Sequence, residues 1–254
     1  MIGADEGQPG AGEQPVFRIA VLASGSGSNL QAMIDQLHGR RAEASAAASC
    51  GAAPGIAPGA APGGGPQSSA PLIQIALVVS DVPGARALER AQQAGIRTAV
   101  VPPADYPDRE QHDLAVVATL LEVEPDLVVL AGYMRIVAAS LLEAFPWRVI
   151  NLHPALLPAF PGTHSIADAV HYAAKVTGVT VHFVDPGVDT GPVIAQVPVR
   201  VLDGDTAETL GSRIHEVEHR LLPEVIRLIA RGRVRPPLSG TRVVQVDWDA
   251  EQTV

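Results

Sequence analysis

The sequence has a single cysteine, few aromatic residues and fewer basic than acidic side chains. Because Cys50 is alone among 254 residues, no disulfide can form within the chain, and we expect a cytoplasmic location. The 18 Lys and Arg are outnumbered by 27 Asp and Glu, which gives a formal net charge of −9. A broad basic surface for nucleic acid is therefore excluded. No apolar run reaches the length of a membrane span, so we expect no membrane partner either.

Metal and nucleophile motifs are also missing. The sequence contains no H-E-x-x-H and no pair of cysteines, so we predict no metal site. It lacks a Walker lysine and a serine-hydrolase G-x-S-x-G elbow. The chemistry must therefore come from other polar groups.

Composition divides the chain into regions. Residues 1–15 are acidic and Gly-rich, and we predict a disordered N-terminal extension. Residues 42–71 hold eleven Ala, six Gly and five Pro, which indicates a flexible insertion unable to bury enough surface to order itself. Around that insertion, residues 16–232 form one predicted domain, and residues 233–254 form a tail without a clear pattern.

Strand and helix patterns alternate through this domain. We expect strands at 16–23, 74–80, 98–101, 127–131, 148–152, 179–184 and 193–201, and helices at 29–37, 84–94, 107–122, 136–144, 164–174 and from 206 onward. Asp205 with Glu208 fits a capping box for the last helix, and Pro223 is expected to bend or divide it. The alternation predicts an α/β fold with a doubly wound, mostly parallel sheet. The crowded spacing at 179–201 predicts an antiparallel strand pair near the C-terminal part.

The loop after the first strand reads A-S-G-S-G-S-N-L-Q from residue 23. Its glycines permit positive φ and the close approach of a ligand. Ser28 with Gln31 fits a capping box, which would start the helix at Asn29. The free N–H groups of Gly27, Ser28 and Asn29, at the positive end of the helix dipole, could then hold a phosphate. The spacing is not G-x-G-x-x-G, and a plain tight turn is the alternative interpretation.

Residues 148–163 read R-V-I-N-L-H-P-A-L-L-P-A-F-P-G-T and carry the strongest chemical signal. Asn151 and His153 follow a buried strand that Pro154 ends, at the edge of the sheet where ligands bind in open α/β folds. An amide donor beside a group that titrates near neutrality suits acyl transfer. Asp189, in the loop D-T-G-P, could orient the His153 ring and favour its charged form. His182 is interpreted as a structural strand residue, with a catalytic role as the alternative.

Four segments together, G-S-G-S-N-L-Q-A, L-A-G-Y-M-R-I, N-L-H-P-A-L-L-P-A-F-P-G and V-H-F-V-D-P-G-V-D-T-G-P-V-I, resemble the phosphoribosylglycinamide formyltransferases. The resemblance covers about residues 17–232 and implies a Rossmann-like formyltransferase fold. It also implies transfer of a formyl group from the co-substrate 10-formyltetrahydrofolate to the amine of 5-phosphoribosylglycinamide in purine synthesis, with these two small molecules as the partners.

The same resemblance assigns roles to individual residues. It implies Asn151, His153 and Asp189 as catalytic residues; Gly27, Ser28 and Asn29 as ligands of the substrate phosphate; Glu218 as the ligand of the substrate amine; and Arg109, Met134, Arg135, Val137 and Asp185 as folate contacts. The insertion and the loop P-G-T-H-S at 161–165 depart from the family pattern, and neither is expected to touch a matched position.

Three other functions stay open. A methionyl-tRNA formyltransferase would share the N-x-H and D-T-G motifs but would need a route to bind a polyanionic RNA. A formyltetrahydrofolate hydrolase would share the catalytic trio but has no use for a phosphate cradle. A non-catalytic nucleotide-binding module would use the glycine loop alone. The oligomeric state cannot be predicted from the sequence.

Overall fold

A computed structural model describes residues 15–43 and 70–248, and its centre is an eight-stranded sheet. Its strands are β1 (Val16–Leu22), β2 (Arg40–Arg41), β3 (Leu72–Ser80), β4 (Thr98–Val100), β5 (Leu127–Leu130), β6 (Val149–His153), β7 (Val176–Phe183) and β8 (Val193–Arg200). The helices are α1 (Ser28–Gln36), α2 (Arg86–Gln93), η1 (Pro103–Asp105), α3 (Arg109–Leu121), α4 (Ala139–Ala144), α5 (Ser165–His171) and α6 (Ala207–Ala230).

The strand order is β2-β3-β1-β5-β6-β7-β8, with β4 paired to β3. The pairs β1–β3, β1–β5, β3–β4 and β5–β6 are parallel, whereas β7 is antiparallel to both β6 and β8. This arrangement confirms the mostly parallel α/β sheet and the antiparallel pair predicted for 179–201. The tail adds a separate small pair, β9 (Val234–Arg235) with β10 (Gln245–Val246).

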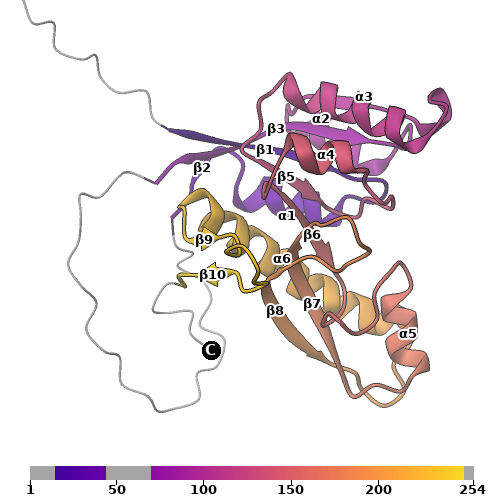
Figure 1. Ribbon diagram of the computed structural model, residues 1–254. Helices are drawn as coiled ribbons and strands as arrows, with labels where there is room; N and C mark the ends of the chain where they lie inside the picture. The colour runs from indigo at the N-terminus through magenta and orange to yellow at the C-terminus, as the bar shows by residue number, and fades with distance from the viewer. Residues whose placement is uncertain (1–14, 44–69, 249–254) are drawn as a thin grey trace, which may run out of the picture.

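The pleat of the buried strands sorts their side chains onto two faces. In β1, Ile19 and Val21 join one buried cluster while Ala20 and Leu22 join the other. The first cluster contains residues of α1, α2, α5 and α6, and the second contains residues of α3 and α4. Helices therefore cover both faces of the sheet, as Figure 1 shows. A doubly wound sheet needs apolar residues at every strand position for this reason.

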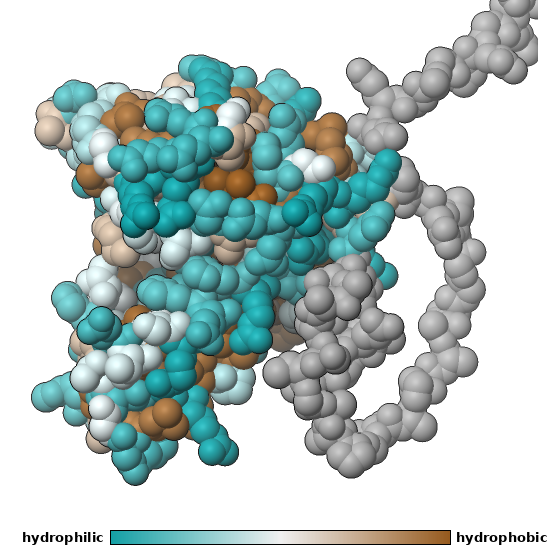
Figure 2. Space-filling model, turned by 180° about the vertical axis from the view of Figure 1, so that it is seen from behind, coloured by the Kyte–Doolittle hydropathy of each residue, from teal (hydrophilic) through white to brown (hydrophobic). Residues whose placement is uncertain are grey.

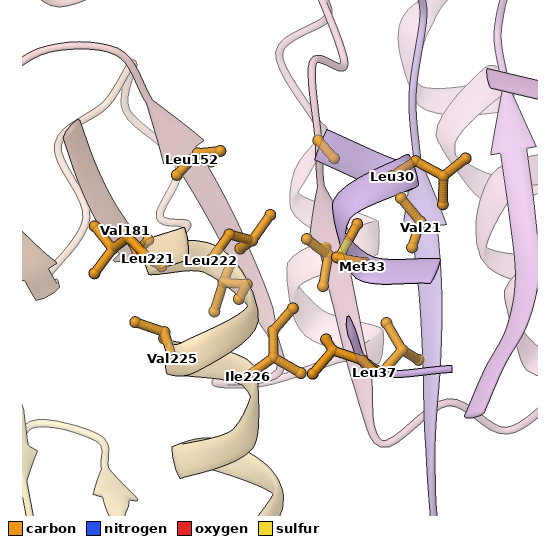
Figure 3. Packing of buried hydrophobic residues seen from close by; sticks show 14 of the residues in the cluster. Val21, Leu30, Met33, Leu37, Leu152, Val181, Leu221, Leu222, Val225 and Ile226 are labelled. Atoms are coloured by element: carbon orange, nitrogen blue, oxygen red, sulfur yellow. The ribbon is translucent and has the colours of Figure 1, made fainter. Parts of the chain in front are cut away.

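The larger cluster joins the two halves of the chain. Figure 3 shows side chains of α1 facing those of α6, with sheet residues Leu152 and Val181 beside them. Met33 on α1 and Leu222 on α6 are fully buried. Burial of one such side chain contributes roughly 1.5–3 kcal/mol. This packing fixes the N-terminus of α1 relative to Glu218, which lies on the buried face of α6.

Several predicted helix boundaries need correction. α1 begins at Ser28 with Gly27 as its N-cap, and no side chain caps it, so the Ser28–Gln31 capping box is wrong. The box at α6 is formed one residue later than predicted, by Thr206 and Thr209. α6 runs undivided for 24 residues with Pro223 inside it. Its packing against the sheet offsets the hydrogen bond that Pro223 removes.

The predicted extension at 1–15 and the predicted insertion at 42–71 lie outside the described residues except at their edges. At those edges, Ala42 N donates to Pro71 O at 2.9 Å, and β2 pairs antiparallel with β3. The two ends of the insertion therefore lie side by side at one margin of the sheet, away from the carboxyl ends of β1, β5 and β6.

One face of the molecule is largely polar. Figure 2 shows one face on which hydrophilic residues dominate and hydrophobic residues occur in separate groups. Within residues 15–43 and 70–248, none of the helices has both the length and the apolar character needed to cross a membrane.

Candidate active site

The antiparallel pairing of β6 with β7 gathers the polar strand residues on one face. Ile150 and Leu152 belong to the larger buried cluster, so the intervening Asn151 and the following His153 point to the opposite face. On β7, His182 pairs directly with Asn151. Cross-strand partners have Cβ atoms about 5 Å apart, so their side chains meet.

Asp189 reaches this cluster from the loop between β7 and β8. Its Oδ2 lies 3.3 Å from His153 Nδ1, and its Oδ1 lies 3.7 Å from His182 Nε2. Asn151 Nδ2 donates to the same Oδ1 at 3.3 Å. Asp189 adopts a positive φ of 52°, a backbone conformation that few non-glycine residues take. The three residues predicted to act together therefore converge in the structure.

The environment of Asp189 keeps its carboxylate ionised. Its hydrogen bond with His182, helped by the Gly162 amide and the charges of both histidines, lowers its pKa to about 2, against the opposing effect of burial. Gly162 N donates to Oδ2 at 2.8 Å. The loop P-G-T-H-S at 161–165 thus touches a matched catalytic position, contrary to the expectation that it would not. The sequence gives no sign of this contact because the loop is distant from Asp189 along the chain.

His153 is buried and faces two hydrogen-bond acceptors. Its Nε2 lies 2.9 Å from the carbonyl oxygen of Phe160, and its Nδ1 faces the Asp189 carboxylate. A neutral imidazole has only one N–H, so only a doubly protonated ring could donate to both acceptors at once.

His182 belongs to the site rather than serving only as a strand residue. Its Nδ1 donates to its neighbour's carbonyl, Phe183 O, at 2.8 Å, which leaves Nε2 facing Asn151 and Asp189. Only 2% of its side chain is exposed. His182 is recognised as part of the site because it pairs with Asn151 across the two strands. That pairing cannot be read from the sequence alone.

The loop after β1, residues 23–29, holds the predicted phosphate ligands Gly27, Ser28 and Asn29 and is called the cradle below. A basic side chain that was not predicted, Arg90, lies beside it. Gly27 has φ +69° and caps α1, which leaves the first amides of the helix without intrahelical partners. Arg90 on α2 donates through Nε to Ser26 O and through its terminal nitrogen to Gln31 Oε1, each at 2.9 Å. Positive charge therefore lies beside this loop, although the chain as a whole is acidic.

Glu218 is joined directly to the cradle. Asn29 Nδ2 donates to Glu218 Oε2 at 3.0 Å, and His215 Nδ1 lies 2.8 Å from the same oxygen. The Glu218 hydrogen bond raises the pKa of His215, whereas burial lowers the pKa of the stacked His219. Only 3% of Glu218 is exposed. A buried carboxylate beside the open end of a helix suits a ligand that carries both a cation and an anion.

A cavity of about 190 Å³ adjoins the catalytic cluster. Its lining includes Asn151, His153, His182 and Asp189, together with Met134, Arg135, Val137 and Asp185. All of the predicted folate contacts except Arg109 are thus in its wall. Arg109 lies at the start of α3 and is exposed.

The cavity wall is tied to the cradle. Ser24 N donates to Gly132 O, and Met134 N donates to Ser24 Oγ, both at 3.0 Å. Ser24 precedes Gly27 in the same loop. The predicted phosphate site and the predicted folate site are therefore neighbouring parts of one sheet edge, as open α/β folds place their ligands.

Across residues 15–43 and 70–248, no group of three or more His, Cys, Asp or Glu has the arrangement of a metal site.

Comparison with known proteins identifies relatives over most of the chain. Residues 66–226 match the family model described as formyl transferase. A phosphoribosylglycinamide formyltransferase of Mycobacterium tuberculosis (strain ATCC 25618 / H37Rv) is 43% identical over 213 residues, which cover 84% of this chain and 85% of that protein. The protein of that name from Bacillus subtilis (strain 168) is 37% identical, over 83% of this chain and 93% of its own length.

A solved structure shows the same fold. The crystal structure of glycinamide ribonucleotide transformylase 1 from Symbiobacterium toebii superposes with a TM-score of 0.75 and 41% sequence identity. The match covers 91% of this chain and 94% of that one.

Proposed function

The chain belongs to the formyl transferase family, among the phosphoribosylglycinamide formyltransferases, and on that premise we propose how its residues carry out the reaction. Its activity is formyl transfer to phosphoribosylglycinamide in de novo purine biosynthesis. We propose 10-formyltetrahydrofolate as the formyl donor and a cytoplasmic location. The observation that carries the residue assignment is the convergence of Asn151, His153 and Asp189 at the wall of one cavity.

The two substrates approach from neighbouring sides of the sheet edge. The phosphate binds the amides of Gly27, Ser28 and Asn29, where the helix dipole adds partial positive charge. Glu218 receives the substrate amine, which has a positive charge when protonated. The folate occupies the cavity lined by Arg135, Val137 and Asp185, so the formyl carbon lies beside Asn151.

The formyl group passes directly from the folate nitrogen to the substrate amine. The neutral amine nitrogen attacks the formyl carbon, and a C–N bond forms as the carbonyl becomes a tetrahedral oxyanion. The bond from that carbon to the folate nitrogen then breaks, and the proton lost by the amine ends on that nitrogen. Formylated phosphoribosylglycinamide and tetrahydrofolate are the products.

Asn151 and His153 stabilise the oxyanion. The Asn151 amide is a donor at the cavity wall, and the charge on His153 attracts the developing negative oxygen. Direct donation by His153 requires one of its N–H groups to leave its present acceptor, and the Phe160 carbonyl is the acceptor that a substrate oxygen can replace. The carboxylate of Asp189 is a charged acceptor and the Phe160 carbonyl is a neutral one, so the contact with Asp189 is the stronger of the two and is kept.

Asp189 acts chiefly through its charge. A carboxylate with a pKa of about 2 holds a proton only transiently near neutral pH. Asp189 therefore does not stay protonated after the amine loses its proton. It keeps His153 in place and charged, and it passes the amine proton onward without retaining it. His182 and Gly162 hold Asp189 in this orientation.

A spectroscopic assay of tetrahydrofolate release tests this assignment. The protein is mixed with 10-formyltetrahydrofolate, with and without phosphoribosylglycinamide. Release that depends on the ribonucleotide is the expected result. Release without it would instead indicate a hydrolase, and no release in either mixture would indicate a binding module.

A further inference from the structure

The cavity wall from Gly132 to Ala138 is held at both ends by side chains from other elements. At its start, Ser24 exchanges hydrogen bonds with Gly132 O and Met134 N, both at 3.0 Å. At its end, Ala138 N donates to Asp113 Oδ2. Between these anchors, Met134 is 67% exposed. The position of the wall therefore depends on the two anchors.

The second anchor is a buried His–Asp pair on α3, formed by His112 and Asp113. Asp113 Oδ1 lies 3.0 Å from His112 Nδ1, and His112 Nε2 donates to Val101 O at 3.0 Å. The exposed fractions of the two side chains are 1% for His112 and 2% for Asp113. A carboxylate this deeply buried is tolerated only when it is paired and hydrogen-bonded. Both oxygens of Asp113 are used, one by the ring and one by the amide of Ala138.

A purely structural purpose does not explain this pair well. Well-packed apolar residues often replace a buried ion pair at no cost in stability. An apolar side chain could not, however, accept the N–H of Ala138. Ala138 is the N-cap residue of α4 and has no side-chain cap of its own. The Asp113 carboxylate thus supplies a hydrogen-bond acceptor for the Ala138 N–H, at the point where the cavity wall leads into α4.

We propose that Asp113 is a positioning residue for folate binding: through the Ala138 amide it sets the wall Gly132–Ala138 against the folate. This inference rests on the proposed function, because it takes the cavity as the folate site. Asp113 does not itself line the cavity, so it touches no substrate. His112 holds the carboxylate in the orientation that reaches Ala138.

Two variants remove the hydrogen bond between Ala138 N and Asp113 Oδ2, one by removing the acceptor and the other by removing the donor. Asp113→Leu keeps a similar shape but removes the acceptor, and His112 then needs only its bond to Val101. Ala138→Pro removes the donor and keeps both His112 and Asp113; the φ of −82° and ψ of 169° at Ala138 are close to those of a proline, whose ring carbon displaces the Asp113 carboxylate from this contact. Val116→Ala is the matched control, because Val116 is a buried α3 residue that packs in the core.

Steady-state kinetics of the folded variants test whether Asp113 positions the cavity wall for folate binding. We expect both anchor variants to raise the KM for 10-formyltetrahydrofolate about ten-fold or more, the loss typical of a hydrogen bond to a charged group. The KM for phosphoribosylglycinamide should stay within about two-fold, and kcat at saturating folate should be retained. Val116→Ala should lower the melting temperature and leave both KM values unchanged.

An unchanged folate KM in folded Ala138→Pro would overturn the inference, and so would an equal rise in both KM values. If Asp113→Leu does not fold, Ala138→Pro decides alone. Turnover by the wild type shows that the proposed function holds, whatever the variants do. A wild type without turnover would overturn both proposals together.

Discussion

Asn29 Nδ2 donates to Glu218 Oε2 across 3.0 Å, although 189 residues separate the two in the chain. The bond joins the first turn of α1 to the middle of α6. It places a buried carboxylate beside the helix end that we assign to the substrate phosphate. One ligand with an anion at one end and an amine at the other can therefore engage both.

Replacing the Glu218 carboxylate by an amide should weaken binding of the ribonucleotide selectively. Glu218→Gln keeps the shape and the bond to Asn29 but removes the charge that attracts the substrate amine. We expect the KM for phosphoribosylglycinamide to rise about ten-fold or more, as for loss of a charge-assisted contact, with the folate KM little changed. Glu216→Gln, at an exposed position of α6, is the control. An equal effect of the two substitutions would count against the assignment.

A side chain at Gly27 should damage the cradle, whereas one at Gly25 should not. The Gly27 backbone has φ +69°, and a Cβ there would lie 2.7 Å from Ala87 Cα. A Cβ at Gly25 would meet nothing within 4 Å. We expect Gly27→Ala to cost about 1–3 kcal/mol of stability through backbone strain and to weaken ribonucleotide binding. Urea unfolding and calorimetric titration of both alanine variants measure the difference, and matching results would contradict this account of the loop.

The stabilising effect of the Asp189 charge should depend on pH. Because folding lowers the pKa of Asp189 from 3.8 to about 2, the ionised carboxylate contributes stability above about pH 4. That contribution should disappear as pH falls through about 2. We expect Asp189→Asn to be less stable than the wild type near pH 6 by on the order of 2 kcal/mol. Unfolding at pH 6, 4 and 2.5 should show the gap closing, and a gap that stays constant with pH would refute this explanation.

Removing the Asn151 amide should slow chemistry more than it weakens binding. Loss of one oxyanion donor typically lowers kcat by about 10²–10³, because the donor acts mainly in the transition state. We expect that loss in Asn151→Ala, with the KM of each substrate within about five-fold of the wild type, because the interaction is made mainly in the transition state. A variant that loses affinity and keeps kcat would show that Asn151 binds substrate instead of stabilising the oxyanion.

Local patterns were enough to predict seven strands of the sheet, but not the two-residue edge strand β2 or the boundaries of the helices. The continuous apolar run at residues 19–22 of β1 indicates burial on both faces, because each successive side chain meets a different helix layer. The N-cap of α1 was harder to predict, because both Ser28 and Gly27 are plausible caps and only the packing against Ala87 decides between them. Pro223 is tolerated for a similar reason, since the tertiary packing of α6 outweighs a local preference.

The convergence of Asn151, His153 and Asp189 was predictable from motifs, whereas the contacts that support it were not. Asn151 and His153 share one strand face by simple periodicity. His182 is recognised only once β7 is paired antiparallel with β6, and Gly162 only once its loop is folded over Asp189. Arg90 and Asp113 likewise act through side chains that reach across the fold. Contacts of this kind depend on three-dimensional packing and leave no pattern in neighbouring residues.

Single-turnover formyl transfer by His153→Ala, with both substrates saturating, tests the central claim most directly. His171→Ala is the matched control, because His171 is an exposed histidine at the end of α5 that does not line the cavity. We predict that His153→Ala transfers the formyl group about 10²–10³ times more slowly than the wild type while His171→Ala keeps the wild-type rate. Equal rates in the two variants would show that the histidine paired with Asp189 takes no part in the chemistry.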